Sequence, residues 1–197
     1  MNKQFYIGLL IAFLILSACK KNGATPENPT NQNAQELITT IILNGYDKNK
    51  PTDATKHFSI SWKDLDGTGG NAPTTDTLTL DTGVTYRVEV LLLDQSKTPF
   101  DTISNEVFEE RNVHQFFYTL SSALTQKINV LRLDYDTNIP ALPLGLSLQI
   151  NPVATAPFAT PFIGSLNVVL SHYDGVPKTT TPSTESDLDI TFPVKLK

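Results

Sequence analysis

The sequence predicts an all-β fold, an antiparallel and immunoglobulin-like β-sandwich, and three observations support this prediction. Apolar and polar residues alternate along most of residues 36–197, which is the pattern of strands with one buried face. Clusters of Gly, Asn, Asp and Pro separate these segments at spacings of about 8–15 residues, as in sandwiches and barrels. The sequence also lacks the alternating strand and helix units from which a parallel α/β sheet is built.

About nine or ten strands are predicted, each with apolar side chains at every second position. In chain order, eight of the apolar faces are Leu37, Thr39, Ile41 and Leu43; Phe58, Ile60 and Trp62; Leu78 and Leu80; Tyr86, Val88, Val90 and Leu92; Leu131, Leu133 and Tyr135; Leu144, Leu146, Leu148 and Ile150; Leu166, Val168 and Leu170; and Leu188, Ile190, Phe192, Val194 and Leu196.

Three segments leave alternatives open. In residues 113–120, either Val113 with Phe117 or Phe116 with Tyr118 points inward. Residues 104–112 are a helical candidate with acidic residues near its start, which suits a helix N-terminus, and a strand or a loop is the alternative. Ser104 is the candidate N-cap of this helix. Pro193 has no N–H to donate to a sheet, which predicts an edge position or a bulge there.

The first nineteen residues have the pattern of a bacterial lipoprotein signal. Lys3 precedes an apolar run that ends at Leu16. At about 1.5 Å per residue this run is too short to span a bilayer core of about 30 Å, and it has the length of a signal-peptide core. The tetrad Leu16, Ser17, Ala18 and Cys19 resembles a lipobox. That resemblance implies cleavage before Cys19, attachment of diacylglycerol to its sulfur and acylation, for example by palmitate, of the new N-terminus.

The cysteine content and the residues that follow Cys19 indicate where the protein is localised. Cys19 is the only cysteine of the chain, so an exported domain could form no internal disulfide, and lipidation would remove a reactive thiol. The alternative is an ordinary cleaved signal with a cysteine nearby by chance. Lys20 and Lys21 stand where an aspartate would retain a lipoprotein in the inner membrane. We therefore expect a lipid-anchored envelope protein, in the outer membrane.

The predicted domain organisation is a signal peptide (1–18), a lipidated cysteine with a flexible tether (19–35) and one β-sandwich domain (36–197). Residues 20–35 (KKNGATPENPTNQNAQ) contain no bulky apolar residue, so they cannot offset the entropy lost on ordering. The net charge of −5 argues against nucleic acid and against anionic lipid surfaces as partners, because both require a basic patch.

The most suggestive candidate site is a calcium loop made by Asp64, Asp66 and Thr68. Together with Gly69, these residues fit positions one, three, five and six of such a loop. Thr75 stands where a bidentate glutamate would close the site. The alternative is a glycine-rich hairpin loop, in which Asp and Gly supply turn geometry. No cofactor other than calcium is expected.

Other polar candidates favour structural roles. Asp134 and Asp136 repeat the acidic spacing of the calcium loop without its glycine. The histidines, His57, His114 and His172, lie outside metal-ligand spacing and have polar neighbours, so each is predicted at the surface or in a turn, although distant histidines can meet in a fold. The five aromatic candidates for stacking on sugars are Trp62, Tyr86, Phe116, Tyr118 and Tyr173.

An enzyme is not expected from this sequence. It contains no Gly-x-Ser-x-Gly elbow, its one cysteine is the lipid site, and no phosphate-binding glycine loop precedes a helix. The acidic pairs Glu109 with Glu110 and Asp187 with Asp189 are expected to be solvated.

Three stretches of the domain carry a resemblance to a known group of proteins. They are residues 62–67 (WKDLDG), 114–118 (HQFFY) and 187–194 (DLDITFPV). With the lipobox, the lysine pair and the asparagine-rich tether, they resemble a group of small Bacteroidetes envelope lipoproteins. Members of that group are often assigned a type 1 periplasmic-binding fold, which is built from repeated βα units. The resemblance implies a membrane anchor and brings no activity and no site residues.

These observations together predict a non-enzymatic binding or adaptor domain, held at the membrane by a lipid on Cys19. Its partner would be an extracellular ligand or an envelope protein. Two alternatives stay open at this point: a structural envelope protein that binds another membrane protein, and a surface domain stabilised by calcium through the Asp64 loop.

Overall fold

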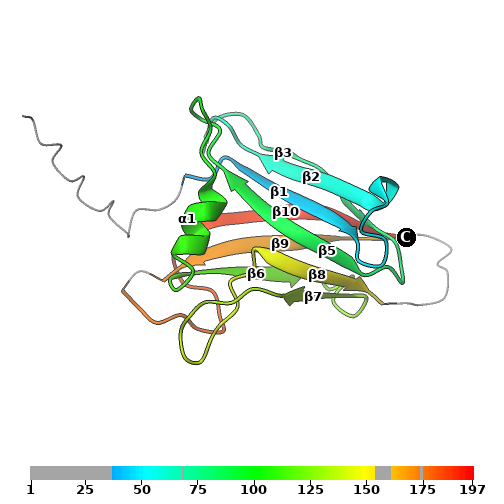
Figure 1. The fold of residues 1–197 in the computed structure, drawn as a ribbon. Coiled ribbons are helices and arrows are strands. Elements are labelled where there is room, and N and C mark those ends of the chain that lie inside the picture. The colour runs from blue at the N-terminus through cyan, green and yellow to red at the C-terminus, as the bar shows by residue number, and fades with distance from the viewer. Residues whose placement is uncertain (1–36, 68, 154–160, 174) are drawn as a thin grey trace, which may run out of the picture. The chain divides into compact units, whose positions relative to one another are not determined.

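Two β-sheets face each other in the computed structural model, which describes residues 37–67, 69–153, 161–173 and 175–197 (Figure 1). One sheet has six strands and the other has four. Within the described residues one short α-helix, α1 (Ile103–Glu109), and one 3-10 turn, η1 (Ala54–Lys56), accompany them. The predicted all-β, sandwich-like arrangement is therefore confirmed in this coarse form. No helix among the described residues combines the length and the apolar character needed to cross a membrane.

The larger sheet is antiparallel throughout. Its strand order is β3-β2-β1-β5-β8-β7. The strands are β1 (Thr40–Asp47), β2 (His57–Lys63), β3 (Thr74–Thr75), β5 (Tyr86–Leu93), β7 (Ile128–Arg132) and β8 (Ser147–Pro152).

The smaller sheet has the order β4-β10-β9-β6 and combines two antiparallel pairs with one parallel pair, β4 with β10. Its strands are β4 (Leu78–Leu80), β6 (His114–Leu120), β9 (Phe162–His172) and β10 (Ser186–Leu196). Pro193 lies just before the residues of β10 that pair with β4, so β9 is its one neighbouring strand. A local edge position of this kind suits a residue without an N–H.

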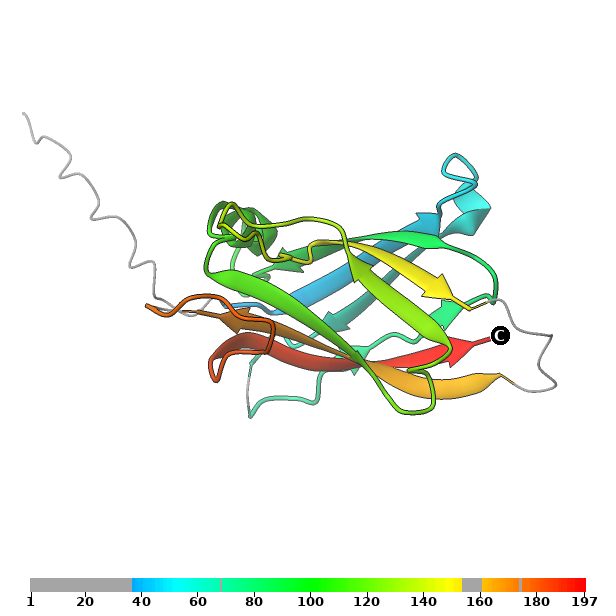
Figure 2. The ribbon, with the colours of Figure 1, turned by 90° about the horizontal axis from the view of Figure 1, so that it is seen from below.

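One hydrophobic core is formed by buried side chains from both sheets. Figure 2 shows the two sheets as separate layers. The predicted apolar faces of β5, β9 and β10 all point into it. In β6 the side chains of Phe116 and Tyr118 point into the core. Of the two phases considered for residues 113–120, this is the observed one. Each fully buried aliphatic or aromatic side chain contributes about 1.5–3 kcal/mol, so this core is the main source of stability.

Three details of the prediction are wrong. Leu37, which was expected on the buried face of the first strand, lies before β1 and is 57% exposed. The apolar face proposed for residues 131–135 is not the buried one, because Ile128 and Val130 turn inward and Leu131 is 42% exposed. The short helix exists as α1, but Ser104 does not cap it. The Ser104 hydroxyl instead accepts a hydrogen bond from the Leu92 N–H at 2.6 Å, which joins α1 to the end of β5.

The sandwich has two ends with different residues. At the first, which we call the proximal end, β1 begins, β9 finishes, and α1 packs beside the sheets (Figure 1). At the other, the distal end, β1 finishes, β2 and β5 begin, and β10 finishes. The eight residues of β1 separate the two ends by roughly 26 Å, at about 3.3 Å per residue.

Candidate functional site

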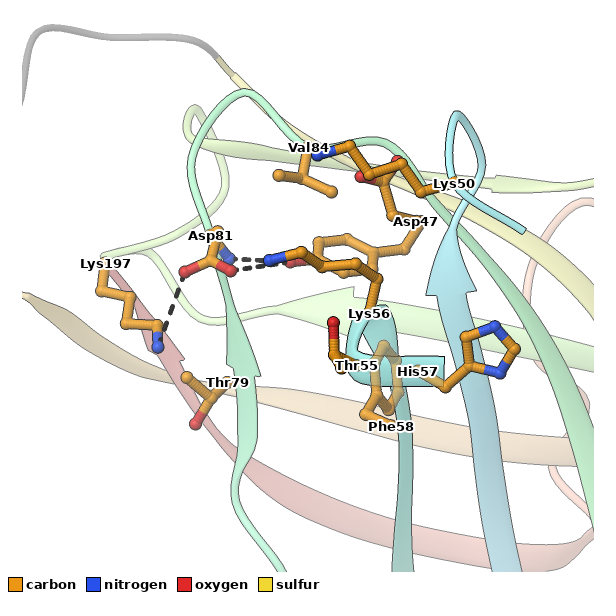
Figure 3. A pocket seen from close by; sticks show the side chains of 11 residues that line it. Asp47, Lys50, Thr55, Lys56, His57, Phe58, Thr79, Asp81, Val84 and Lys197 are labelled. Carbon is orange, nitrogen blue, oxygen red and sulfur yellow. Dashed lines mark hydrogen bonds and ion pairs between the residues drawn. The ribbon is translucent and has the colours of Figure 1, made fainter. Parts of the chain in front are cut away.

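A pocket of about 320 Å³ lies at the distal end and is the first candidate site (Figure 3). This volume falls at the small end of the range of ligand sites, about 300–1,000 Å³. We call it the distal pocket, and its lining residues are Asp47, Lys50, Thr55, Lys56, His57, Phe58, Thr79, Asp81, Val84, Tyr86 and Lys197.

The aromatic wall of the distal pocket depends on a glycine. Phe58 of β2 lies directly opposite Gly45 of β1, and a side chain at Gly45 would overlap the Phe58 ring. The absence of a Cβ therefore lets this ring lie over β1. Phe58 also meets Tyr86 edge-on, with ring centroids 5.7 Å apart. The glycine thus permits the ring placement that forms one side of the pocket.

Tyr86 links the pocket wall to the loop that follows β4. Its hydroxyl oxygen accepts a hydrogen bond from the Asp81 N–H at 3.0 Å, and the ring is buried. Burial raises the pKa of Tyr86, and the nearby Asp81 carboxylate adds to this effect. The phenol is therefore neutral at physiological pH, and its O–H donates to the Asp81 carboxylate at 3.5 Å.

Three lysines line the distal pocket, although the whole chain is acidic. Lys197 forms an exposed ion pair with Asp81 at 3.6 Å. Lys50 and Lys56 form no ion pair with any described residue. The 3-10 turn that carries Lys56 is held by Asp53, which accepts hydrogen bonds from the Thr55 hydroxyl and N–H. The pocket therefore combines an aromatic wall with two lysines outside any such ion pair, and the Asp47 carboxylate also lines it.

The predicted calcium loop is described only in part, because Thr68 lies outside the described residues. Asp64 accepts a hydrogen bond from the Gly67 N–H at 3.0 Å, and Asp66 accepts one from the Asn71 N–H at 2.9 Å. These bonds are the turn geometry of the alternative interpretation, and the bonds from Asn71 lower the pKa of Asp66. The calcium site stays a prediction, which melting temperatures in calcium and in chelator would test.

The second acidic segment has a structural role in the described fold. Asp134 accepts hydrogen bonds from three consecutive backbone N–H groups, those of residues 145–147, at 2.8–3.2 Å. Asp136 pairs with the Lys178 ammonium at 3.0 Å, and both side chains are buried. Burial alone would raise the pKa of Asp136, but the hydrogen bonds from the Leu142 N–H and from Lys178 outweigh it and lower this pKa. Both carboxylates are therefore occupied by the chain itself.

The prediction that every histidine lies at the surface or in a turn is wrong for two of them. His57 is exposed at the rim of the distal pocket, but His114 and His172 are 0% and 5% exposed. They are directly opposed in the register of β6 and β9, with ring centroids 4.5 Å apart. Asp187, which was expected to be solvated, has a buried side chain against both rings.

The described residues hold one group of three or more side chains able to ligate a metal, namely His114, His172 and Asp187. Asp187 Oδ2 lies 3.3 Å from His114 Nε2, and Asp187 Oδ1 lies 3.5 Å from His172 Nδ1. We call these three residues the His–Asp cluster. The sequence contains no local signal for it, because register and not spacing brings the residues together.

The structure brings few of the other sequence candidates to either site. Of the five aromatic candidates for sugar stacking, Tyr86 alone lines the distal pocket, and Phe116 and Tyr118 face the core.

The lipobox residues Leu16, Ser17, Ala18 and Cys19 lie outside the described residues. No protein-family model, no curated protein and no solved structure matches this chain.

Proposed function

We propose that this chain is a lipid-anchored protein of the bacterial outer membrane whose β-sandwich is a non-enzymatic binding domain. The distal pocket would be its binding site. The lipobox supports the anchor, and the alternating strands support an immunoglobulin-like connectivity of the sandwich. One observation carries the binding role: two lysines that form no ion pair with a described residue share a pocket with an aromatic wall, at the end of the domain remote from the start of β1.

The chemistry of the lining defines the ligand class. Lys50 and Lys56 favour a negatively charged group. Phe58 and Val84 favour an apolar or aromatic body. The volume of about 320 Å³ limits the ligand to a small molecule. We therefore propose a small organic anion with an apolar part, such as an aromatic carboxylate or phosphate ester.

A thermal-shift experiment on the full chain in detergent tests the binding role. Phenyl phosphate is the anionic probe, benzyl alcohol is the neutral probe, and inorganic phosphate tests the charge alone. We expect phenyl phosphate to raise the melting temperature most, because a ligand that binds only the folded state stabilises it. The double variant Lys50→Gln/Lys56→Gln should lose this shift, and Lys63→Gln, an exposed lysine at the other end of β2, should keep it.

Protease digestion of intact cells tests the anchor and the direction in which the domain faces. The native protein should remain with the membrane, and a Cys19→Ala variant should be released from it. Removal of the domain from intact cells would place it outside, where an extracellular ligand is the partner. Release of the wild-type protein without a lipid would contradict the proposal.

A further inference from the structure

We propose that the His–Asp cluster, formed by His114, His172 and Asp187, binds one divalent transition-metal ion of the zinc class. The cluster lies at the proximal end, so this site is separate from the distal pocket and goes beyond the function proposed above. Its argument rests on how the backbone places the three side chains, on unsatisfied polar atoms and on the distances between the donor atoms.

Register places the two imidazoles, and a break in register places the carboxylate. His114 and His172 are a directly opposed pair of β6 and β9, both on the core side of the sheet. Between β9 and β10 the register shifts between Ser186 and Leu188, as at a β-bulge. Asp187 is the extra residue. A bulge redirects a side chain, and here the carboxylate is buried against both imidazoles.

The hydrogen bonding of His114 leaves a lone pair directed at the carboxylate. Its Nδ1 lies 3.3 Å from the Glu110 carbonyl oxygen, which can only accept, so Nδ1 carries the proton of the neutral ring. Nε2 then has the lone pair, and it faces Asp187 Oδ2 at 3.3 Å without forming a hydrogen bond. Two buried acceptors at this distance repel each other unless a proton or a metal ion lies between them.

Three polar atoms of the cluster lack hydrogen-bond partners. His114 Nε2, His172 Nε2 and Asp187 Oδ2 are all inaccessible to solvent and accept or donate no hydrogen bond. These three are the buried side-chain polar atoms of the described residues that have none. A buried polar atom without a partner costs about 1–3 kcal/mol, and all three atoms belong to one cluster. Ligation of an ion by His114 Nε2 and Asp187 Oδ2 would satisfy two of these atoms.

The distances fit a zinc-like ion. Bonds of about 2.0–2.1 Å at tetrahedral angles place neighbouring ligand atoms about 3.3–3.4 Å apart. The separation is 3.3 Å from His114 Nε2 to Asp187 Oδ2 and 3.5 Å from His172 Nδ1 to the other carboxylate oxygen, Oδ1. One ligand atom from each of the three residues lies within 4.8 Å of the others. Two imidazole nitrogens and a carboxylate oxygen suit zinc and its transition-metal neighbours better than calcium. The Glu110 carbonyl is the outer partner that orients the His114 ring.

An acidic hollow lies beside one residue of the cluster. It has a volume of about 410 Å³ at the proximal end, and Asp187 is one of its lining residues. Asp64 and Asp189 also line it, and no lysine or arginine is among the described residues that do. A hollow with three carboxylates attracts cations and repels anions. One residue of the predicted calcium loop, Asp64, therefore lines the same hollow as Asp187.

A metal at this site would join β6, β9 and β10 and would stabilise the smaller sheet. The test uses the full chain in detergent after removal of metals by a chelator. We expect Zn²⁺ to bind with one-to-one stoichiometry in calorimetry and to raise the melting temperature, and Co²⁺ to give the visible absorption of a site with nitrogen and oxygen ligands. Absence of one-to-one binding in the wild-type chain would overturn the proposal.

Matched variants separate this site from other histidines and carboxylates. Asp187→Asn keeps the shape of the side chain and supplies a donor to the imidazoles, so we expect a folded protein that has lost the one-to-one binding. Glu89→Gln, which changes an exposed carboxylate of β5 that does not line the hollow, should bind as the wild type does. Equal binding by both variants would contradict the site even if His114→Gln failed to fold.

Discussion

The carboxylate of Asp136 and the ammonium of Lys178 form an ion pair at 3.0 Å in which both side chains are almost fully buried. The same ammonium donates a hydrogen bond to the Arg111 carbonyl at 2.8 Å. A charge held this far from water depends on its partner, because loss of one partner leaves the other uncompensated. This pair ties residues 134–145 to the segment that follows β9.

We expect Lys178→Met to lower the free energy of unfolding by about 3–5 kcal/mol, because it leaves the Asp136 carboxylate buried without a counter-ion. Lys197→Met is the matched control. Lys197 pairs with Asp81 at 3.6 Å, and both side chains are exposed, so its loss should cost about 0–1 kcal/mol. Urea unfolding of the three proteins measures both effects, and equal costs would contradict the role assigned to burial.

Asp136 also predicts a loss of stability in acid. Because its pKa is lowered in the folded state, the stabilisation is complete above the unfolded value of about 4 and disappears as the pH falls through the folded value. We expect the free energy of unfolding to fall below about pH 4, and less steeply in Asp136→Asn. Asp189→Asn, which changes an exposed carboxylate, should keep the wild-type slope.

Tyr118 predicts a loss of stability in alkali. Its hydroxyl donates a hydrogen bond to the Gly145 carbonyl at 2.7 Å, and burial raises the pKa of Tyr118 well above its usual value. The unfolded chain ionises this tyrosine near pH 10 while the folded chain does not, so stability should decline above about pH 10. Tyr118→Phe should cost about 1 kcal/mol at neutral pH and reduce the alkaline decline. Tyr135→Phe, at an exposed position, should do neither.

Gly45→Ala tests the aromatic wall of the distal pocket. The added methyl group would overlap the Phe58 ring and displace it, which should cost about 1–3 kcal/mol. The displaced ring should also reduce the thermal shift caused by phenyl phosphate. Asn44→Ala, at the exposed neighbouring position of β1, should change stability by less than about 0.5 kcal/mol and keep the shift. If phenyl phosphate shifts the melting temperature of Gly45→Ala as much as that of the wild type, Phe58 is not part of the ligand site.

Much of the fold could be predicted from the sequence, because strands with one buried face show a period of two. The last strand is the clearest case, since Leu188, Ile190, Phe192, Val194 and Leu196 are all buried as expected. Residues 128–135 misled the prediction because both phases of this segment are apolar. The strand ends at Arg132, and the hydrogen bonds that Asp134 accepts hold the chain in a different path beyond it.

The candidate sites could not be predicted to the same extent, for a different physical reason. His114 and His172 meet because β6 and β9 pair in one particular register, and a shift by one residue would turn each ring to the other face. Asp187 reaches them through a local break in register that alternation does not show. The position of the Phe58 ring could have been predicted in part. A glycine inside an apolar strand, as at Gly45, is typical of a close approach by a neighbouring group.

The order of strands in the smaller sheet has a consequence for how the domain assembles. The six strands of the larger sheet all lie within residues 40–152, so that sheet can pair as soon as this part of the chain has emerged from the ribosome. β4 and β6 have no neighbour in their own sheet until β9 and β10 are made. Until then the apolar face of the larger sheet has no second layer, and such surfaces recruit chaperones or aggregate. Folding of this domain is therefore completed by its last two strands.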